Sequence, residues 1–149
     1  MLFRSAAIYR NCTTTVAASG VLTTLNFTDK VQDTHNAVTT GADWTFTAPA
    51  PGFYMIQGYC QVASGSFSIS GNFVFSLTVN GVDQVIRLGR YEFYRTGTLA
   101  PCTTLSGGVY LNAGETLKIK AANSESGTRT MQSGATFNQI SIYRLGGVM

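Results

Sequence analysis

Short runs rich in Val, Ile, Phe, Tyr and Thr recur along the sequence, and clusters of Gly, Asn, Asp and Ser separate them. No long segment places its apolar residues at the spacing of an amphipathic helix. Such short runs between turn-forming clusters are typical of β-strands. We therefore expect an all-β chain with strands near residues 2–9, 21–27, 43–47, 53–63, 72–79, 82–88, 90–95, 107–111, 115–122 and 136–145.

The connections carry recognisable turn chemistry. Asn80-Gly81 separates FVFSLTV from VDQVIRL and predicts a type I′ hairpin, because both central residues of that turn need positive φ. Residues 111–115 (LNAGE) form a second tight connection, Gly65-Ser66 and Gly107-Gly108 are interpreted as turns, and 123–134 is a polar loop. This spacing predicts one sandwich or jelly-roll domain over residues 1–149, with 1–15 an N-terminal arm or a first strand.

Two strands are apolar on both faces. Side chains alternate between the faces of a strand, and a two-layer sandwich buries only one face of each sheet. In the segment FYMIQGYCQV, Tyr54, Ile56, Cys60 and Val62 fit the core. The opposite face, which should be polar, carries Phe53, Met55, Gln57 and Tyr59.

The last strand repeats this pattern. Ile140 and Ile142 fit the core, while Phe137, Gln139 and Tyr143 are predicted to lie opposite. Three aromatics per chain, at 150–250 Å² each, are worth on the order of 10 kcal/mol before association costs. Either other subunits cover this second face, or loops of the same chain do so. The first alternative makes it a self-association surface.

Composition bears on the class of protein. Charged residues make up 11% of the chain, the net charge is +3, and Thr and Ser are abundant, so little charge repulsion keeps copies apart. Cys12, Cys60 and Cys102 are an odd number with no metal-like spacing, which favours folding in a reducing compartment. The opening MLFRSAAIYRN does not resemble a signal peptide, and no apolar run is long enough to span a membrane, so we expect no membrane insertion.

Catalytic machinery is not recognisable, and we expect a protein that is not an enzyme and has no cofactor. The single histidine, His35, lies in the polar stretch DTHNA, and GxSxG does not occur. Asp29, Asp33 and Asp43 are either turn residues or ligands of a Ca²⁺ ion. Trp44 is either a core residue or a sugar-stacking residue.

One cluster mixes arginines and aromatics. Arg87, Arg90 and Arg95 alternate with Tyr91, Phe93 and Tyr94, a mixture that can bind single-stranded nucleic acid. A strand with one basic, solvated face gives the same pattern. The total charge favours the second interpretation, so we expect no nucleic-acid partner.

The span from Phe27 to Tyr54 matches a known signature at Phe27, Asp33, Phe46, Gly52 and Tyr54, with FTAPAPGFY its most specific part. LNAGETLKI and SGATFNQISIYRL are similar to later strands of the same family. On these residues the chain distantly resembles the complement C1q-like branch of the tumour-necrosis-factor-like jelly rolls. The resemblance implies a ten-stranded jelly roll that forms tight trimers. It also implies that Phe53, Met55, Gln57, Phe137, Gln139 and Tyr143 face the threefold axis.

Two functions are compatible with such a trimer. The first is a structural protein of a tailed-phage virion, either a capsid decoration (cement) protein or a fibre knob, assembled in the host cytoplasm with a capsid or tail protein as partner. The second is a soluble trimeric recognition module, lectin-like or cytokine-like, that binds a host-surface glycan or a protein receptor. The sequence does not choose the partner.

Overall fold

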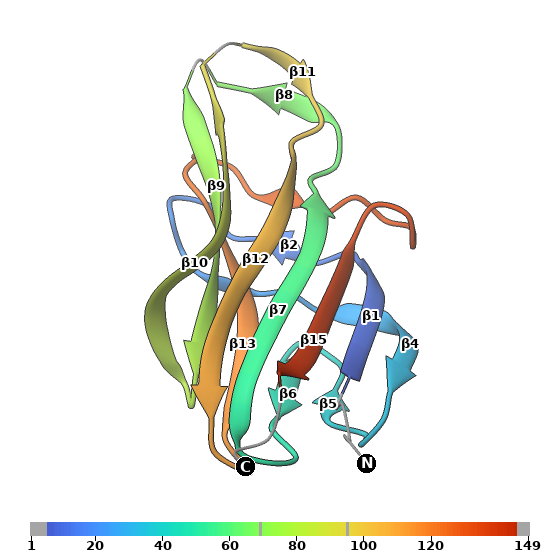
Figure 1. Cartoon of the computed structure of the whole chain (residues 1–149). Coiled ribbons are helices and arrows are strands. Elements are labelled where there is room, and N and C mark those ends of the chain that lie inside the picture. Colours follow the sequence, from blue (N-terminus) through green and yellow to red (C-terminus); the bar gives the residue numbers. More distant parts are fainter. Residues whose placement is uncertain (1–5, 69, 95, 146–149) are drawn as a thin grey trace.

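Two facing antiparallel sheets form the body of the protein (Figure 1). The computed structural model describes residues 6–68, 70–94 and 96–145. The five-stranded sheet has the order β12-β7-β15-β1-β4, and the six-stranded sheet has the order β10-β9-β13-β6-β5 with β3 paired to β13. Within the described ranges there is no helix long and apolar enough to cross a membrane.

The strand bounds are as follows. The five-stranded sheet contains β1 (Ala6–Cys12), β4 (Phe27–Asp33), β7 (Gly52–Gln61), β12 (Cys102–Leu111) and β15 (Gln139–Leu145). The six-stranded sheet contains β3 (Thr23–Thr24), β5 (Val38–Thr39), β6 (Thr45–Thr47), β9 (Gly71–Val79), β10 (Val82–Phe93) and β13 (Thr116–Asn123). Two small pairs complete the fold: β8 (Gly65–Phe67) with β11 (Gly97–Leu99), and β2 (Thr15–Val16) with β14 (Arg129–Thr130).

The predicted fold class, an all-β jelly roll, is confirmed, but several boundaries differ. The two strands predicted at 82–88 and 90–95 are one strand, β10, whose register against β9 shifts between Asp83 and Arg87 and again between Arg87 and Gly89. The prediction missed β4 because TDKVQD is polar except for Val31. This strand lies at the edge of its sheet, where charged residues discourage pairing with other chains.

The Asn80-Gly81 turn is confirmed. Both residues have positive φ, 49° and 78°, and the flanking Val79 and Val82 are paired in the β9–β10 ladder. The interpretation of Gly107-Gly108 as a turn is wrong, because both residues lie inside β12. A side chain at either position would collide with a neighbour: a Cβ would lie 2.7 Å from Leu88 Cδ2 at Gly107 and 2.4 Å from the Phe53 ring at Gly108.

The core lies between the two sheets, and its middle is aromatic. Trp44 is fully buried and meets Phe27 and Tyr9 edge to face, at centroid distances of 5.7 and 6.2 Å. The alternative that Trp44 stacks on a sugar is therefore wrong. Tyr54 and Ile56 are also fully buried, as the alternation along 53–62 predicts.

One end of the sandwich carries the two-stranded β8–β11 sheet, whose strands are separated in the chain by β9 and β10 (Figure 1). Arg129 holds β8 in place. Its guanidinium lies 4.4 Å from the Phe67 ring centroid and donates a hydrogen bond to the Ser66 carbonyl at 2.8 Å. It also pairs with Glu125 at 3.0 Å. Glu125 also accepts hydrogen bonds from Ser68. The first residues of β7 and the last residues of β12 and β15 lie at the opposite end (Figure 1).

Candidate functional site: an exposed sheet face and an aromatic pocket

Three large apolar side chains stand next to one another on the outer face of the five-stranded sheet. Phe53 of β7 is paired with Tyr110 of β12 on one side and with Leu145 of β15 on the other. They retain 42%, 51% and 51% of their surface, respectively. Loops of the same chain therefore leave about half of each residue exposed, although an isolated sandwich would place polar residues here.

The next row of the same face is also apolar. Met55 is paired with Tyr143 on β15 and with Gly108 on β12, and both Met55 and Tyr143 are half-buried. The Phe53 ring lies over Gly108, which has no side chain to lift it from the sheet. We call Phe53, Met55, Tyr110, Tyr143 and Leu145 the apolar end of this outer face.

The other half of the face is polar. Gln57 is paired with Ser141, and Tyr59 is paired with Gln139. Arg10 on β1 is paired with Gln139 and donates from Nε to Gln139 Oε1 at 2.8 Å. The face therefore changes along its strands from an apolar end to a hydrogen-bonding end.

The sequence identified much of this face but not all of it. The predicted residues on 53–59 and 139–143 are all on it, and their role as an interface stays a prediction. Tyr110 and Leu145 were missed, because the signal that finds them is the pairing of their strands with β7 rather than any local pattern.

Phe137 does not lie on the last strand as predicted. The strand begins at Gln139, and Phe137 belongs to a turn in which its N–H donates to the Gly134 carbonyl at 3.2 Å. The reason is Asn138, whose fully buried side chain accepts from the Gln61 N–H at 3.0 Å and so occupies the place of a ladder residue. Phe137 is 36% exposed beside this turn.

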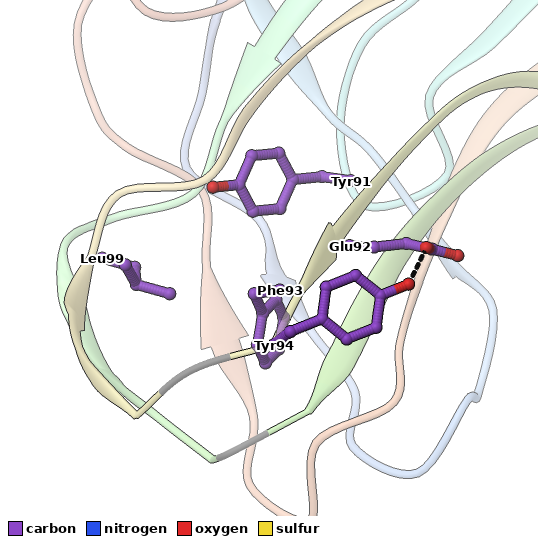
Figure 2. Close-up of a pocket in the computed structure, with 5 residues that line it drawn as sticks. All are labelled: Tyr91, Glu92, Phe93, Tyr94 and Leu99. Atoms are coloured by element: carbon purple, nitrogen blue, oxygen red, sulfur yellow. Dashed lines mark hydrogen bonds between the residues drawn. The ribbon is translucent and has the colours of Figure 1, made fainter.

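A second feature is a pocket at the end of the sandwich that carries the two-stranded β8–β11 sheet. Its volume is about 250 Å³, and its lining residues are Tyr91, Glu92, Phe93, Tyr94 and Leu99. Figure 2 shows the rings of Tyr91 and Phe93 and the Leu99 side chain arranged around a common space, with Tyr94 beside them. Phe93 is almost fully buried and packs at 5.1 Å on Phe67, whereas Tyr94 is 74% exposed.

Charge at the pocket is balanced among the described residues. Arg90 pairs with Glu92 at 2.5 Å, and the Tyr94 hydroxyl donates a hydrogen bond to the same carboxylate (Figure 2). That hydrogen bond raises the pKa of Tyr94. Arg90 is paired across the ladder with Val74 on the outer side of the sheet, whereas the following Tyr91 points into the pocket. Tyr91 and Phe93 therefore lie on the face opposite Arg90, as in a strand with one basic, solvated face, whereas the exposed Tyr94 lies beside Arg90 and Glu92; Arg95 lies outside the described residues.

The polar residues considered as calcium ligands or bases have other roles. Asp33 accepts from the backbone N–H groups of Ala37 and Val38 at 2.9 and 3.0 Å and from the Tyr9 hydroxyl at 3.1 Å. Asp43 is paired with Lys118. His35 is exposed beside Thr34. Over residues 6–68, 70–94 and 96–145, no three acidic, cysteine or histidine side chains are grouped as metal ligands.

Comparison with known proteins identifies solved structures that share this fold. No protein-family model matches the chain, and no curated protein matches it in sequence. Among solved structures, Eiger TNF from S. frugiperda superposes with a TM-score of 0.67 at 15% identity, covering 98% of this chain and 95% of that one. Murine APRIL gives a TM-score of 0.62 at 13% identity over 95% of this chain and 99% of that one. The globular domain of zebrafish complement 1qA gives 0.60 at 13% identity, with coverages of 97% and 99%.

These likenesses confirm the C1q/TNF-like jelly roll that the resemblance in FTAPAPGFY implied. The identities lie far below the range in which activity or partners can be transferred. The chain therefore shares a fold with these proteins, and its function must be argued from its own surfaces.

Proposed function

We propose that the protein is a non-enzymatic homotrimer whose subunits associate through the outer face of the five-stranded sheet. The observation that carries this proposal is the contiguous row of Phe53, Tyr110 and Leu145, each 42–51% exposed on a sheet face that has no covering layer among the described residues. Contiguous exposed apolar patches of this kind mark association sites. The C1q/TNF-like fold supports a threefold arrangement rather than a twofold one.

The exposed apolar surface of these residues is large enough to contribute to the free energy of association. Complete burial of a large apolar side chain is worth about 1.5–3 kcal/mol, so the exposed 42–51% of these three residues is worth roughly 2–4 kcal/mol per chain. Burial of Met55 and Tyr143 adds to this. Association costs several kcal/mol, so the net affinity depends on how well three copies fit together.

Oligomeric state in solution tests this proposal. Multi-angle light scattering should give about three times the chain mass of 15.9 kDa. Met55→Asp should dissociate the trimer, because it places a charge in the covered region. Val21→Asp is the matched control, since Val21 is 58% exposed in the loop before the six-stranded sheet's β3. A stable wild-type monomer would refute the proposal.

We further propose that this trimer has a structural role in the virion of a tailed phage, as a capsid decoration protein or a fibre knob. A closed threefold trimer matches the local threefold positions of an icosahedral shell. The three free thiols, Cys12, Cys60 and Cys102, suit assembly in a reducing cytoplasm. A weakly charged surface suits close packing against a shell.

The test compares two binding targets. Purified trimer is incubated with empty capsids of the source phage and, separately, with whole host cells, and the bound fraction is measured by co-sedimentation. Saturable binding to capsids alone supports decoration, and binding to cells alone supports a fibre knob. Binding to neither refutes a virion role.

A second candidate is a soluble recognition module. The specific observation in its favour is the pocket beside the 74%-exposed Tyr94, because large exposed aromatic side chains at a domain's tip are characteristic of binding surfaces. A receptor pull-down with the isolated trimer distinguishes this candidate from decoration, since a decoration protein captures no host-surface receptor.

A further inference from the structure

We propose that the pocket formed by Tyr91, Phe93, Tyr94 and Leu99 binds a saccharide ring. This site is separate from the apolar end of the five-stranded sheet, and its existence does not depend on whether the trimer decorates a shell or recognises a receptor. The shape, polarity, charge and position of the pocket each favour a saccharide.

The shape fits a single ring. A volume of about 250 Å³ lies just below the range of pockets for drug-sized ligands, so it accommodates one ring rather than an extended molecule. Phe93, 3% exposed, forms the floor, and the Tyr91 ring and Leu99 form the sides (Figure 2). The flat rings of the half-buried Tyr91 and the 74%-exposed Tyr94 are the surfaces available to the C–H face of a pyranose.

The polar groups at the rim complement hydroxyls. The half-buried Tyr91 has no hydrogen-bond partner for its hydroxyl among the described residues, so that hydroxyl can donate to or accept from a ligand. The Glu92 carboxylate accepts from Tyr94 and pairs with Arg90, and it keeps further acceptor sites. A few placed polar groups around an apolar floor are the usual composition of a ligand site.

The charge balance selects the class of ligand. Because Arg90 neutralises Glu92, the described pocket offers no unpaired charge to a cation or an anion. A neutral ligand with an apolar face and a hydroxylated edge satisfies both the rings and the rim. A quaternary ammonium would instead need an uncompensated carboxylate or several rings enclosing it.

The pocket is preorganised. Leu99 is paired with Gly65 in the two-stranded β8–β11 sheet, and Arg129 ties β8 through Ser66 and the Phe67 ring to the buried Glu125. Phe93 in turn packs on Phe67. Binding therefore does not require the β8–β11 pair to order first, which lowers the entropic cost for a small ligand.

The position keeps the two surfaces apart. The pocket lies at the β8–β11 end of the sandwich, whereas Phe53, Tyr110 and Leu145 lie at the opposite end (Figure 1). If the proposed trimer forms with its strands near the axis, three pockets face the same direction. A surface glycan with repeated units then binds with an avidity above that of one site.

Saturation-transfer NMR on the full chain, with glucose, galactose, mannose and N-acetylglucosamine as separate probes, tests the proposal. We expect at least one probe to bind with a Kd of about 1 mM, as is usual for a ligand of this size. Tyr94→Ala should weaken that binding roughly 2- to 10-fold through loss of an aromatic surface. Tyr94→Phe keeps the ring and should weaken it less. Tyr91→Phe, which removes only the Tyr91 hydroxyl, should weaken it about fivefold.

The outcomes separate this site from the trimer. Binding of a probe that is reduced by the Tyr91 and Tyr94 variants but unchanged by Met55→Asp supports a saccharide pocket independent of assembly. If no probe binds at 10–20 mM, well above the roughly 1 mM expected, the proposal is wrong. Binding that all pocket variants leave unchanged also overturns it, because the saccharide then lies elsewhere on the protein.

Discussion

Replacing Phe53 by Asp is the most direct perturbation of the proposed assembly. The Phe53 side chain is 42% exposed and rests on Gly108, so its removal opens no cavity in the core between the sheets. The isolated subunit should therefore keep its fold. A defect in assembly can then be measured without a defect in folding.

The magnitude follows from the exposed fraction. Complete burial of a Phe side chain is worth about 1.5–3 kcal/mol, so the 42% still available contributes about 1 kcal/mol per chain and about 3 kcal/mol per trimer. Phe53→Ala should thus raise the trimer dissociation constant roughly 100-fold. Phe53→Asp adds the cost of desolvating three carboxylates, several kcal/mol each, and should abolish the trimer at micromolar concentration.

Sedimentation velocity over a dilution series measures the monomer–trimer equilibrium, and near-ultraviolet circular dichroism verifies the fold of each variant. Val21→Asp, at a residue 58% exposed outside the five-stranded sheet, should sediment like the wild type. A folded Phe53→Asp variant that remains trimeric would show that this face is not the interface.

Three further predictions concern the subunit itself. Burial raises the pKa of Glu125, but hydrogen bonds from Ser68 and the Arg129 ion pair outweigh it and lower the pKa. The ionised Glu125 stabilises the fold above its unfolded-state pKa of about 4.3, and this stabilisation is lost as the pH falls through the lowered pKa of the folded state. Glu125→Gln should therefore reduce the free energy of unfolding by about 1.5–3 kcal/mol near neutral pH, measured by chemical denaturation. It should also make the stability depend less on pH in the acidic range. Cys102 is exposed whereas Cys60 is buried, and burial raises the Cys60 pKa, so a thiol reagent should label Cys102 in the native protein and Cys60 only after denaturation. Burial and the Asp33 carboxylate raise the pKa of Tyr9 to about 12, so stability should fall as the pH rises from about 10 towards that value, and Tyr9→Phe should remove this loss in alkaline melting curves.

The sequence predicted those parts of the fold that local chemistry decides. Asn80-Gly81 specifies its turn by itself, and the alternation through Tyr54 and Ile56 identifies the core face of β7. The sequence did not predict the glycines inside β12. Gly108 makes room for the Phe53 ring, which belongs to β7 and is far from Gly108 in the chain. Non-local packing of this kind leaves no short-range signature.

The same distinction applies to the two surfaces. Phe53 and Met55 were found because their strand violates the expected polar alternation, a defect visible in one segment. Tyr110 and Leu145 complete that surface only through the ladder register that puts them on either side of Phe53. The pocket depends on a further long-range pairing. Leu99 reaches Tyr91 because β11 pairs with β8 rather than continuing into β12.

The arrangement of these surfaces has a mechanical consequence for the proposed trimer. Apolar contact at the Phe53 end fixes the subunits there, while the Arg10–Gln139 end of the same face carries an exposed side-chain hydrogen bond. A polar contact between subunits contributes less than an apolar one, since it exchanges hydrogen bonds with water for hydrogen bonds with protein. The subunits should therefore be held most firmly at the end opposite the β8–β11 pairs. The three β8–β11 pairs, each held in place by Arg129 and Glu125, then vary in separation more readily than the Phe53 end does. That freedom lets three identical pockets engage ligands whose spacing is not fixed.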